Sequence, residues 1–104
     1  MSLWEVVYSE QARLNLRNIY EYIAYNLLVP ETAKKQAERI MKAIESLDDM
    51  PERNPLYEKE PWRSRGLRKL IVDNYIAFYL PIEKSKQILI VSIMYGGRNI
   101  EELI

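Results

Sequence analysis

The segment LRKLIVDNYIAFYLPIEKSKQILIVSIMY, residues 67–95, decides the fold of this 104-residue chain. It contains three runs rich in β-branched, aromatic and other apolar residues, at 67–72, 75–80 and 87–95. Such runs are typical of β-strands. The polar gaps between them, at 73–74 and 83–86, have the length of hairpin turns. We therefore predict three antiparallel strands joined as a meander.

Two helical segments precede these strands. Ser9 is a favourable N-cap residue, and Pro30 suits the first turn of a second helix. Apolar residues at helical spacing form one face of the first helix, at Ala12, Leu16, Ile19, Tyr20, Ile23 and Leu27. The second helix has a similar stripe, formed by Ala33, Ala37, Ile40, Met41, Ile44 and Leu47. Because their connection is short, we expect the helices to pack as an antiparallel hairpin.

The remaining segments complete the expected fold. Residues 4–8 form a first strand, the proline-rich stretch 51–62 is a loop, and residues 99–104 form a final helical turn. This order predicts a single α+β domain, residues 1–104. In it, the N-terminal strand belongs to a twisted antiparallel sheet whose last three strands form the meander. The helical hairpin packs on one face of the sheet, and the other face is partly open.

Composition restricts the chemistry of the chain. It has no cysteine and no histidine, which excludes a disulfide scaffold, a thiolate or histidine metal site and a Ser–His–Asp triad. Fifteen basic and fifteen acidic side chains cancel, so overall charge does not mark a nucleic-acid or membrane binder. No apolar run approaches the roughly 20 residues that span a bilayer. We expect a cytoplasmic protein without a cofactor or metal.

The basic residues are unevenly distributed. Arg63, Arg65, Arg68 and Lys69 lie within seven positions, and no acidic residue interrupts residues 61–72. A neutral chain can therefore still present a basic site beside an acidic rim. Strand alternation should send Arg68 and Lys69 to opposite faces, so that only one of them easily joins a single site. For Arg63 and Arg65, a solvated strand edge is an equally good interpretation.

Five short motifs follow one another in a characteristic order: Tyr8-Ser9-x-x-Ala12, Ala37-Glu38-x-Ile40, Arg65-Gly66-Leu67-Arg68-Lys69, Asn74-Tyr75-x-x-x-Tyr79 and Ile93-Met94-Tyr95-Gly96-Gly97-Arg98-Asn99. In this order and spacing, they resemble the RelE/ParE superfamily of toxins from type II toxin–antitoxin modules, also called plasmid stabilisation proteins. The resemblance covers nearly the whole chain. It implies a growth-arresting toxin, neutralised when a C-terminal segment of a cognate antitoxin wraps around its open sheet face or its helical hairpin.

The superfamily divides by target. ParE-like members inhibit DNA gyrase and have no nuclease activity, whereas RelE-like members enter the ribosomal A site and cleave mRNA. The nucleases generally carry an Arg directly after the first Tyr of the Tyr-x-x-x-Tyr motif, where this sequence has Ile76. The family's closing Arg-Arg-Asp is reduced here to Gly97-Arg98-Asn99. Both departures favour a gyrase inhibitor.

The resemblance also implies a surface that engages the target, and we expect it to contain Arg65, Arg68, Lys69, Tyr95 and Arg98. The alternative function is a ribosome-dependent, metal-free mRNA endonuclease, in which Arg68, Lys69 and Arg98 would suffice to hold phosphate charge. A third hypothesis is an inactive remnant that only binds an antitoxin. The implied partners are a cognate antitoxin and either DNA gyrase or the ribosome with mRNA, and no membrane is expected among them.

Overall fold

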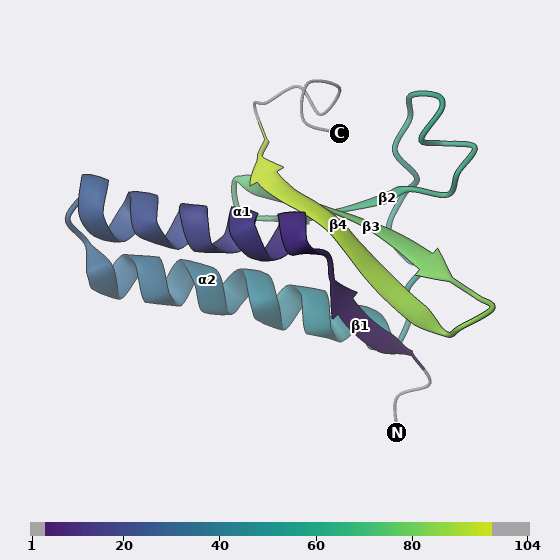
Figure 1. Ribbon diagram of the computed structural model, residues 1–104, viewed down its shortest axis with the longest axis horizontal. Coiled ribbons are helices and arrows are strands. Elements are labelled where there is room, and N and C mark those ends of the chain that lie inside the picture. Colours follow the sequence, from purple (N-terminus) through teal and green to yellow (C-terminus); the bar gives the residue numbers. More distant parts are fainter. Residues whose placement is uncertain (1–3, 97–104) are drawn as a thin grey trace.

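Two helices lie side by side against one face of a four-stranded sheet, and their connection projects away from it (Figure 1). The structure, a computed structural model, describes residues 4–96. Its elements are β1 (Glu5–Tyr8), α1 (Glu10–Glu21), the π-helical turn η1 (Tyr22–Asn26), α2 (Pro30–Glu45), the 3₁₀ turn η2 (Ser46–Asp48), β2 (Arg68–Val72), β3 (Tyr75–Ile82) and β4 (Gln87–Tyr95). The predicted order and the antiparallel meander of β2, β3 and β4 are confirmed.

The prediction of an entirely antiparallel sheet is wrong in one respect. The observed sheet is mixed, because one pair of its strands is parallel. The strand order is β1-β4-β3-β2, and β1 pairs in parallel with β4, with Tyr8 opposite Ile90. The helical hairpin between β1 and β2 acts as a crossover that lets β2 run parallel to β1. After two hairpin reversals, β4 runs in that same direction and fills the place beside β1.

The main core lies between the helical hairpin and the sheet. It contains Ala12, Ile40, Ile44, Leu47, Leu70, Ala77, Tyr79, Ile88, Ile90 and Ile93. Two residues predicted for the apolar helix faces are instead exposed. Met41 borders an outer groove between the helices, and Leu27 lies beyond the end of η1, where the chain turns toward α2.

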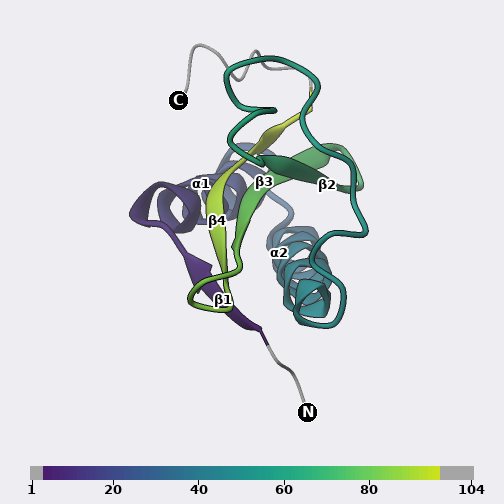
Figure 2. The same ribbon diagram turned by 90° about the vertical axis from the view of Figure 1, so that its right-hand side faces the viewer.

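A second, smaller core lies on the opposite face of the sheet. The predicted loop at 51–62 contains no helix or strand, and it packs Tyr57 and Trp62 against this face. The Tyr57 ring meets Phe78 edge to face, with a centroid distance of 5.6 Å. Figure 2 shows the loop, in teal, rising beside β2. The rest of this face is open around Ile71, which is 65% exposed.

Ser9 fixes the junction between β1, α1 and β4. Its hydroxyl accepts a hydrogen bond from the Ala12 backbone N–H at 2.9 Å, which confirms the predicted N-cap. The same hydroxyl donates to the Val91 carbonyl at 2.7 Å. Val91 is the extra residue of a bulge, because Phe78 lies opposite Ser92 whereas Tyr79 lies opposite Ile90. The bulge changes the alternation of β4, so that Tyr95 reaches the helical side of the sheet beside Tyr75.

No helix in the stretch 4–96 is both long enough and apolar enough to cross a membrane. The predicted final helical turn at 99–104 lies outside the described residues.

Candidate functional site

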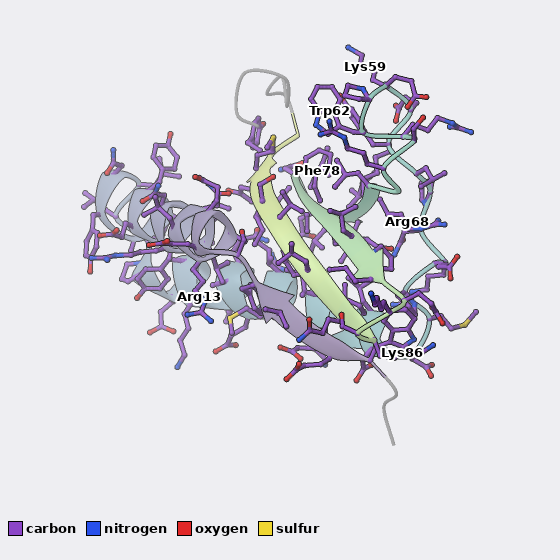
Figure 3. All side chains as sticks on the ribbon, turned by 45° about the vertical axis from the view of Figure 1, so that its right-hand side comes forward. Arg13, Lys59, Trp62, Arg68, Phe78 and Lys86 are labelled. Atoms are coloured by element: carbon purple, nitrogen blue, oxygen red, sulfur yellow. The ribbon has the colours of Figure 1, made fainter. Side chains whose placement is uncertain are left out.

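An apolar groove runs between the outer sides of α1 and α2. It has a volume of about 450 Å³ and is lined by Tyr8, Arg13, Leu16, Arg17, Tyr20, Ala37 and Met41. The lining combines the end of β1 with one stripe of each helix, so the helical hairpin itself creates the groove. Figure 3 shows Arg13 on this side of the molecule, well apart from Arg68.

Two polar groups of the groove have unused bonding capacity. Arg17 forms an ion pair with Glu21 at 3.3 Å, but Arg13 forms none within residues 4–96. The Tyr8 hydroxyl is buried and has no hydrogen-bond partner in the same range. Burial, and secondarily the nearby Glu45 carboxylate, raises the pKa of Tyr8 to about 12. The groove therefore offers apolar surface and an available guanidinium, while the neutral Tyr8 hydroxyl lies buried beneath it.

Arg68 attaches the loop before β2 to the sheet. Its Nη1 donates to the Asn54 carbonyl at 2.6 Å and to the Glu52 carbonyl at 3.1 Å, while Nη2 lies 3.6 Å from a Glu52 carboxylate oxygen. The side chain is only 18% exposed. These contacts occupy much of the guanidinium's donor capacity within the fold.

Lys69 lies on the opposite face of the sheet from Arg68, as strand alternation predicts, because it is paired with Phe78 while Arg68 is paired with Tyr79. Its Nζ lies 3.1 Å from the Glu58 carboxylate. A hydrogen bond from its own backbone N–H and one from Lys69 lower the pKa of Glu58. Lys69 is thus already paired with an anion.

Arg65 is more available than Arg68 and Lys69, the other basic residues predicted for the target surface within residues 4–96. It is exposed and forms no ion pair within the described part of the chain. The turn that carries it is fixed by Glu60, whose carboxylate accepts hydrogen bonds from the Ser64 backbone N–H, at 2.7 Å, and from the Ser64 hydroxyl. These two bonds lower the pKa of Glu60.

Tyr95 lies in a different part of the molecule from these cations. Its ring packs edge to face on Tyr75, with a centroid distance of 5.9 Å, and the residue is 55% exposed. Burial, and then the neighbouring hydroxyls of Tyr95 and Tyr22, raises the pKa of Tyr75. Arg68 is paired with Tyr79, four residues further along β3, which separates it from this corner by roughly 13 Å.

The five predicted site residues therefore do not form one compact cluster. Arg65, Arg68 and Lys69 are neighbours along the chain but differ in orientation and pairing, and Tyr95 lies at the far end of the sheet. Arg98 is outside the described residues.

Sequence reasoning missed a polar anchor between α2 and the turn joining β2 to β3. The Asp73 carboxylate accepts hydrogen bonds from Arg39 Nε at 2.8 Å and from Gln36 Nε2 at 2.9 Å. These bonds, that from Arg39 first, lower the pKa of Asp73. The signal in the sequence was Gln36, a polar residue three positions after Ala33 and four before Ile40, on the apolar stripe of the second helix.

A family model, described as the ParE toxin of the type II toxin-antitoxin system parDE, matches residues 6–100. A solved chain from the chromosomal ParDE system of P. aeruginosa is 22% identical, with a TM-score of 0.73, and the match covers 89% of this chain and 96% of that chain.

Two RelBE toxin–antitoxin complexes also contain similar chains. For RelBE2 of Mycobacterium tuberculosis, the identity is 16% and the TM-score 0.63, covering 88% of this chain and 96% of that chain. For the intact RelBE complex of E. coli, the identity is 14% and the TM-score 0.62, and the match covers 91% of this chain and 99% of that chain. At such identities these likenesses show a shared fold. A comparison with curated proteins finds no match.

Proposed function

Because this chain belongs to the ParE toxin family of type II toxin–antitoxin systems, we propose that it arrests growth by inhibiting DNA gyrase when its antitoxin is absent. Membership makes it the toxin component of such a system. The choice of gyrase as target is the proposal, and it depends on how the basic side chains are arranged.

The observation that carries the proposal is the separation and pairing of Arg68 and Lys69. Attack by a ribose 2′-hydroxyl requires a base, an acid and cations that converge on one phosphate. Arg68 binds loop carbonyls on one side of the sheet, and Lys69 binds Glu58 on the other. Ile76, where related nucleases carry a cation, packs beside the apolar cluster of Phe78 and Met94. This arrangement favours binding over RNA cleavage.

Arg65 and Tyr95 are the exposed members of the proposed target surface. Arg68 and Lys69 fix the loop that presents Arg65, so we propose that they act mainly by positioning it. The role of Arg98 stays a prediction.

The experiment is brief, tightly controlled induction in a bacterial host, with labelled thymidine and labelled methionine followed in parallel. We expect thymidine incorporation to fall first, and the purified chain to inhibit supercoiling by gyrase. An earlier fall in methionine incorporation would contradict the proposal and support the mRNA endonuclease. No fall in either label would support the inactive remnant.

The endonuclease remains the second candidate because of one feature of the loop. Arg63 and Arg65 are exposed on the same loop that packs Tyr57 and Trp62 on the face of Lys69. Cations beside aromatic rings suit single-stranded RNA. Primer extension on ribosome-bound mRNA would reveal new 5′ ends only if this function is correct.

The groove between α1 and α2 is our proposed site for the antitoxin. Its apolar lining suits one face of an amphipathic helix, and Arg13 suits an acidic group at the edge of that helix. We therefore propose that the antitoxin inserts a helical segment with at least one carboxylate directed at Arg13.

A further inference from the structure

The connection between α1 and α2 exposes an unusual amount of apolar surface. Residues 22–30 form an uncharged run, Tyr-Ile-Ala-Tyr-Asn-Leu-Leu-Val-Pro. Five of its large side chains are exposed: Tyr22, Tyr25, Leu27, Leu28 and Val29. We call these five residues the hairpin tip. The connection between the helices projects away from the sheet (Figure 1), whereas Tyr22 lies at the base of the tip, close to Tyr75 of β3. None of the five residues belongs to a core cluster of the domain.

Leu28 is unfavourable at its position for two separate reasons. It is 79% exposed, so its side chain contributes little to the fold. Its backbone φ is +56°, in the left-handed region where glycine or asparagine usually ends a helix. A leucine there costs roughly 1–2 kcal/mol relative to a right-handed conformation. A residue that is both strained and exposed in the monomer indicates a role outside the monomer.

We propose that the hairpin tip is a homodimer interface, in which two copies of this chain pack tip to tip about a two-fold axis. The area of the tip supports this partner. On ordinary side-chain areas, the five residues expose roughly 600 Å², the upper end of what a typical monomer shows as one patch. Complete burial of two such patches would cover about 1,200 Å² in total, the lower limit for a specific interface.

Charge also favours a second copy. The tip itself carries no charged residue, and the whole chain has a net charge of zero. Two copies can therefore approach without long-range repulsion, and a near-zero net charge promotes self-association. The groove proposed for the antitoxin lies toward the β1 end of the hairpin, so the two surfaces are separate.

The test exploits the backbone of Leu28. In Leu28→Asn, the new residue tolerates the left-handed conformation but lacks the apolar side chain. At concentrations where both chains are monomeric, we expect the variant to have a melting temperature at or above that of the wild type. Each dimer would lose two buried leucine side chains, so the dissociation constant should rise about a hundredfold. Sedimentation velocity over a concentration series of the purified chain measures this change.

Ile71→Asn is the matched control. Ile71 is another strongly exposed apolar residue, but it lies on β2 and outside the tip, so this change should leave the dimer unaffected. The proposal is wrong if the wild type is monomeric at all concentrations, or if Leu28→Asn dimerises as tightly as the wild type. In either case, the tip is not a homodimer interface.

A second measurement does not depend on the stability of Leu28→Asn. Because the natural chain has no cysteine, Leu28→Cys carries a single thiol. A short bismaleimide should join two Leu28→Cys chains efficiently at concentrations where the wild type is dimeric. Ile71→Cys should remain uncrosslinked under the same conditions. Equal crosslinking of the two variants would overturn the proposal.

Discussion

Arg68 belongs to a motif expected to contact the target, but its side chain is already bonded within the domain. Its guanidinium donates hydrogen bonds to the backbone carbonyls of Glu52 and Asn54, at the start of the loop. Loss of activity in Arg68→Ala would therefore not separate target binding from loop disorder. Arg65, which is exposed and forms no ion pair within residues 4–96, is the better residue for testing target contact.

We predict that Arg68→Met lowers the free energy of unfolding by about 1–3 kcal/mol, because partly buried carbonyls lose charged donors. Urea denaturation of the purified chain measures the change. Arg65→Met is the control, and its effect should stay within about 0.5 kcal/mol, as is usual for exposed positions. Equal effects of the two substitutions would show that Arg68 does not fasten the loop.

At the scale of single residues, the sequence predicts orientation better than partnership. Alternation along β2 correctly separates Arg68 from Lys69. It does not reveal that each finds its partner in the loop at 52–58, because irregular backbone has no period from which contacts follow. The position of Tyr95 depends on the bulge at Val91, and β-propensity does not reveal an extra residue in a strand.

At the scale of elements, periodicity identifies both helices and all four strands. Local residue preferences correctly place the N-cap of α1 at Ser9 and the first residue of α2 at Pro30, because caps and prolines act locally. The direction of β1 could not be read in this way. Parallel pairing with β4 depends on where the chain returns after the hairpin, and no local residue pattern encodes that return.

Asp73 joins the β2–β3 turn to α2 through hydrogen bonds from Arg39 and Gln36. Because its carboxylate titrates, the strength of this contact depends on pH. The bonds from Arg39 and Gln36 keep the pKa of Asp73 below its unfolded value. The carboxylate therefore stabilises the fold above the unfolded pKa, near 4, and this contribution is lost as pH falls through the folded pKa. We predict that Asp73→Asn melts below the wild type at pH 7 and that the difference shrinks below about pH 4.

Thermal melts at pH 7, 4 and 3 test this prediction. Asp49→Asn is a suitable control, because Asp49 is exposed and forms no ion pair in the described stretch 4–96. Its melting temperature should follow that of the wild type at every pH. A difference between Asp73→Asn and the wild type that does not change with pH would contradict the proposed anchor.

The helical hairpin presents the groove, and Arg13 is its available charge. We predict that Arg13→Glu weakens antitoxin binding about tenfold to a hundredfold, because it turns an attraction for an acidic group into repulsion. Titration calorimetry with the protein encoded by the neighbouring gene measures the loss. Lys35→Glu makes the same charge change on α2 outside the groove and should have little effect. Similar losses in both variants would indicate net charge rather than the groove.

At the scale of the whole molecule, the two ends of the described chain hold the domain together. β1 is attached to the sheet only through β4, which lies more than 80 residues later in the sequence. The start of the helical hairpin, and with it the groove beside Tyr8, is therefore held in place by the last strand as well as by the shared core. The target surface proposed at Tyr95 and the antitoxin groove thus depend on the same long-range pairing.

Removal of the Ser9 hydroxyl tests the junction at which β1 and α1 meet β4. This hydroxyl caps α1 and donates to the carbonyl of Val91, the bulge residue that is not paired with any residue of β3. We predict that Ser9→Ala lowers the free energy of unfolding by about 1–3 kcal/mol, since a cap and a partly buried acceptor are lost together. In Ser85→Ala, an exposed turn residue changes in the same way, and its stability should remain within about 0.5 kcal/mol of the wild type. If Ser9→Ala is no more destabilising than Ser85→Ala in urea denaturation, the junction of β1, α1 and β4 does not depend on this hydroxyl.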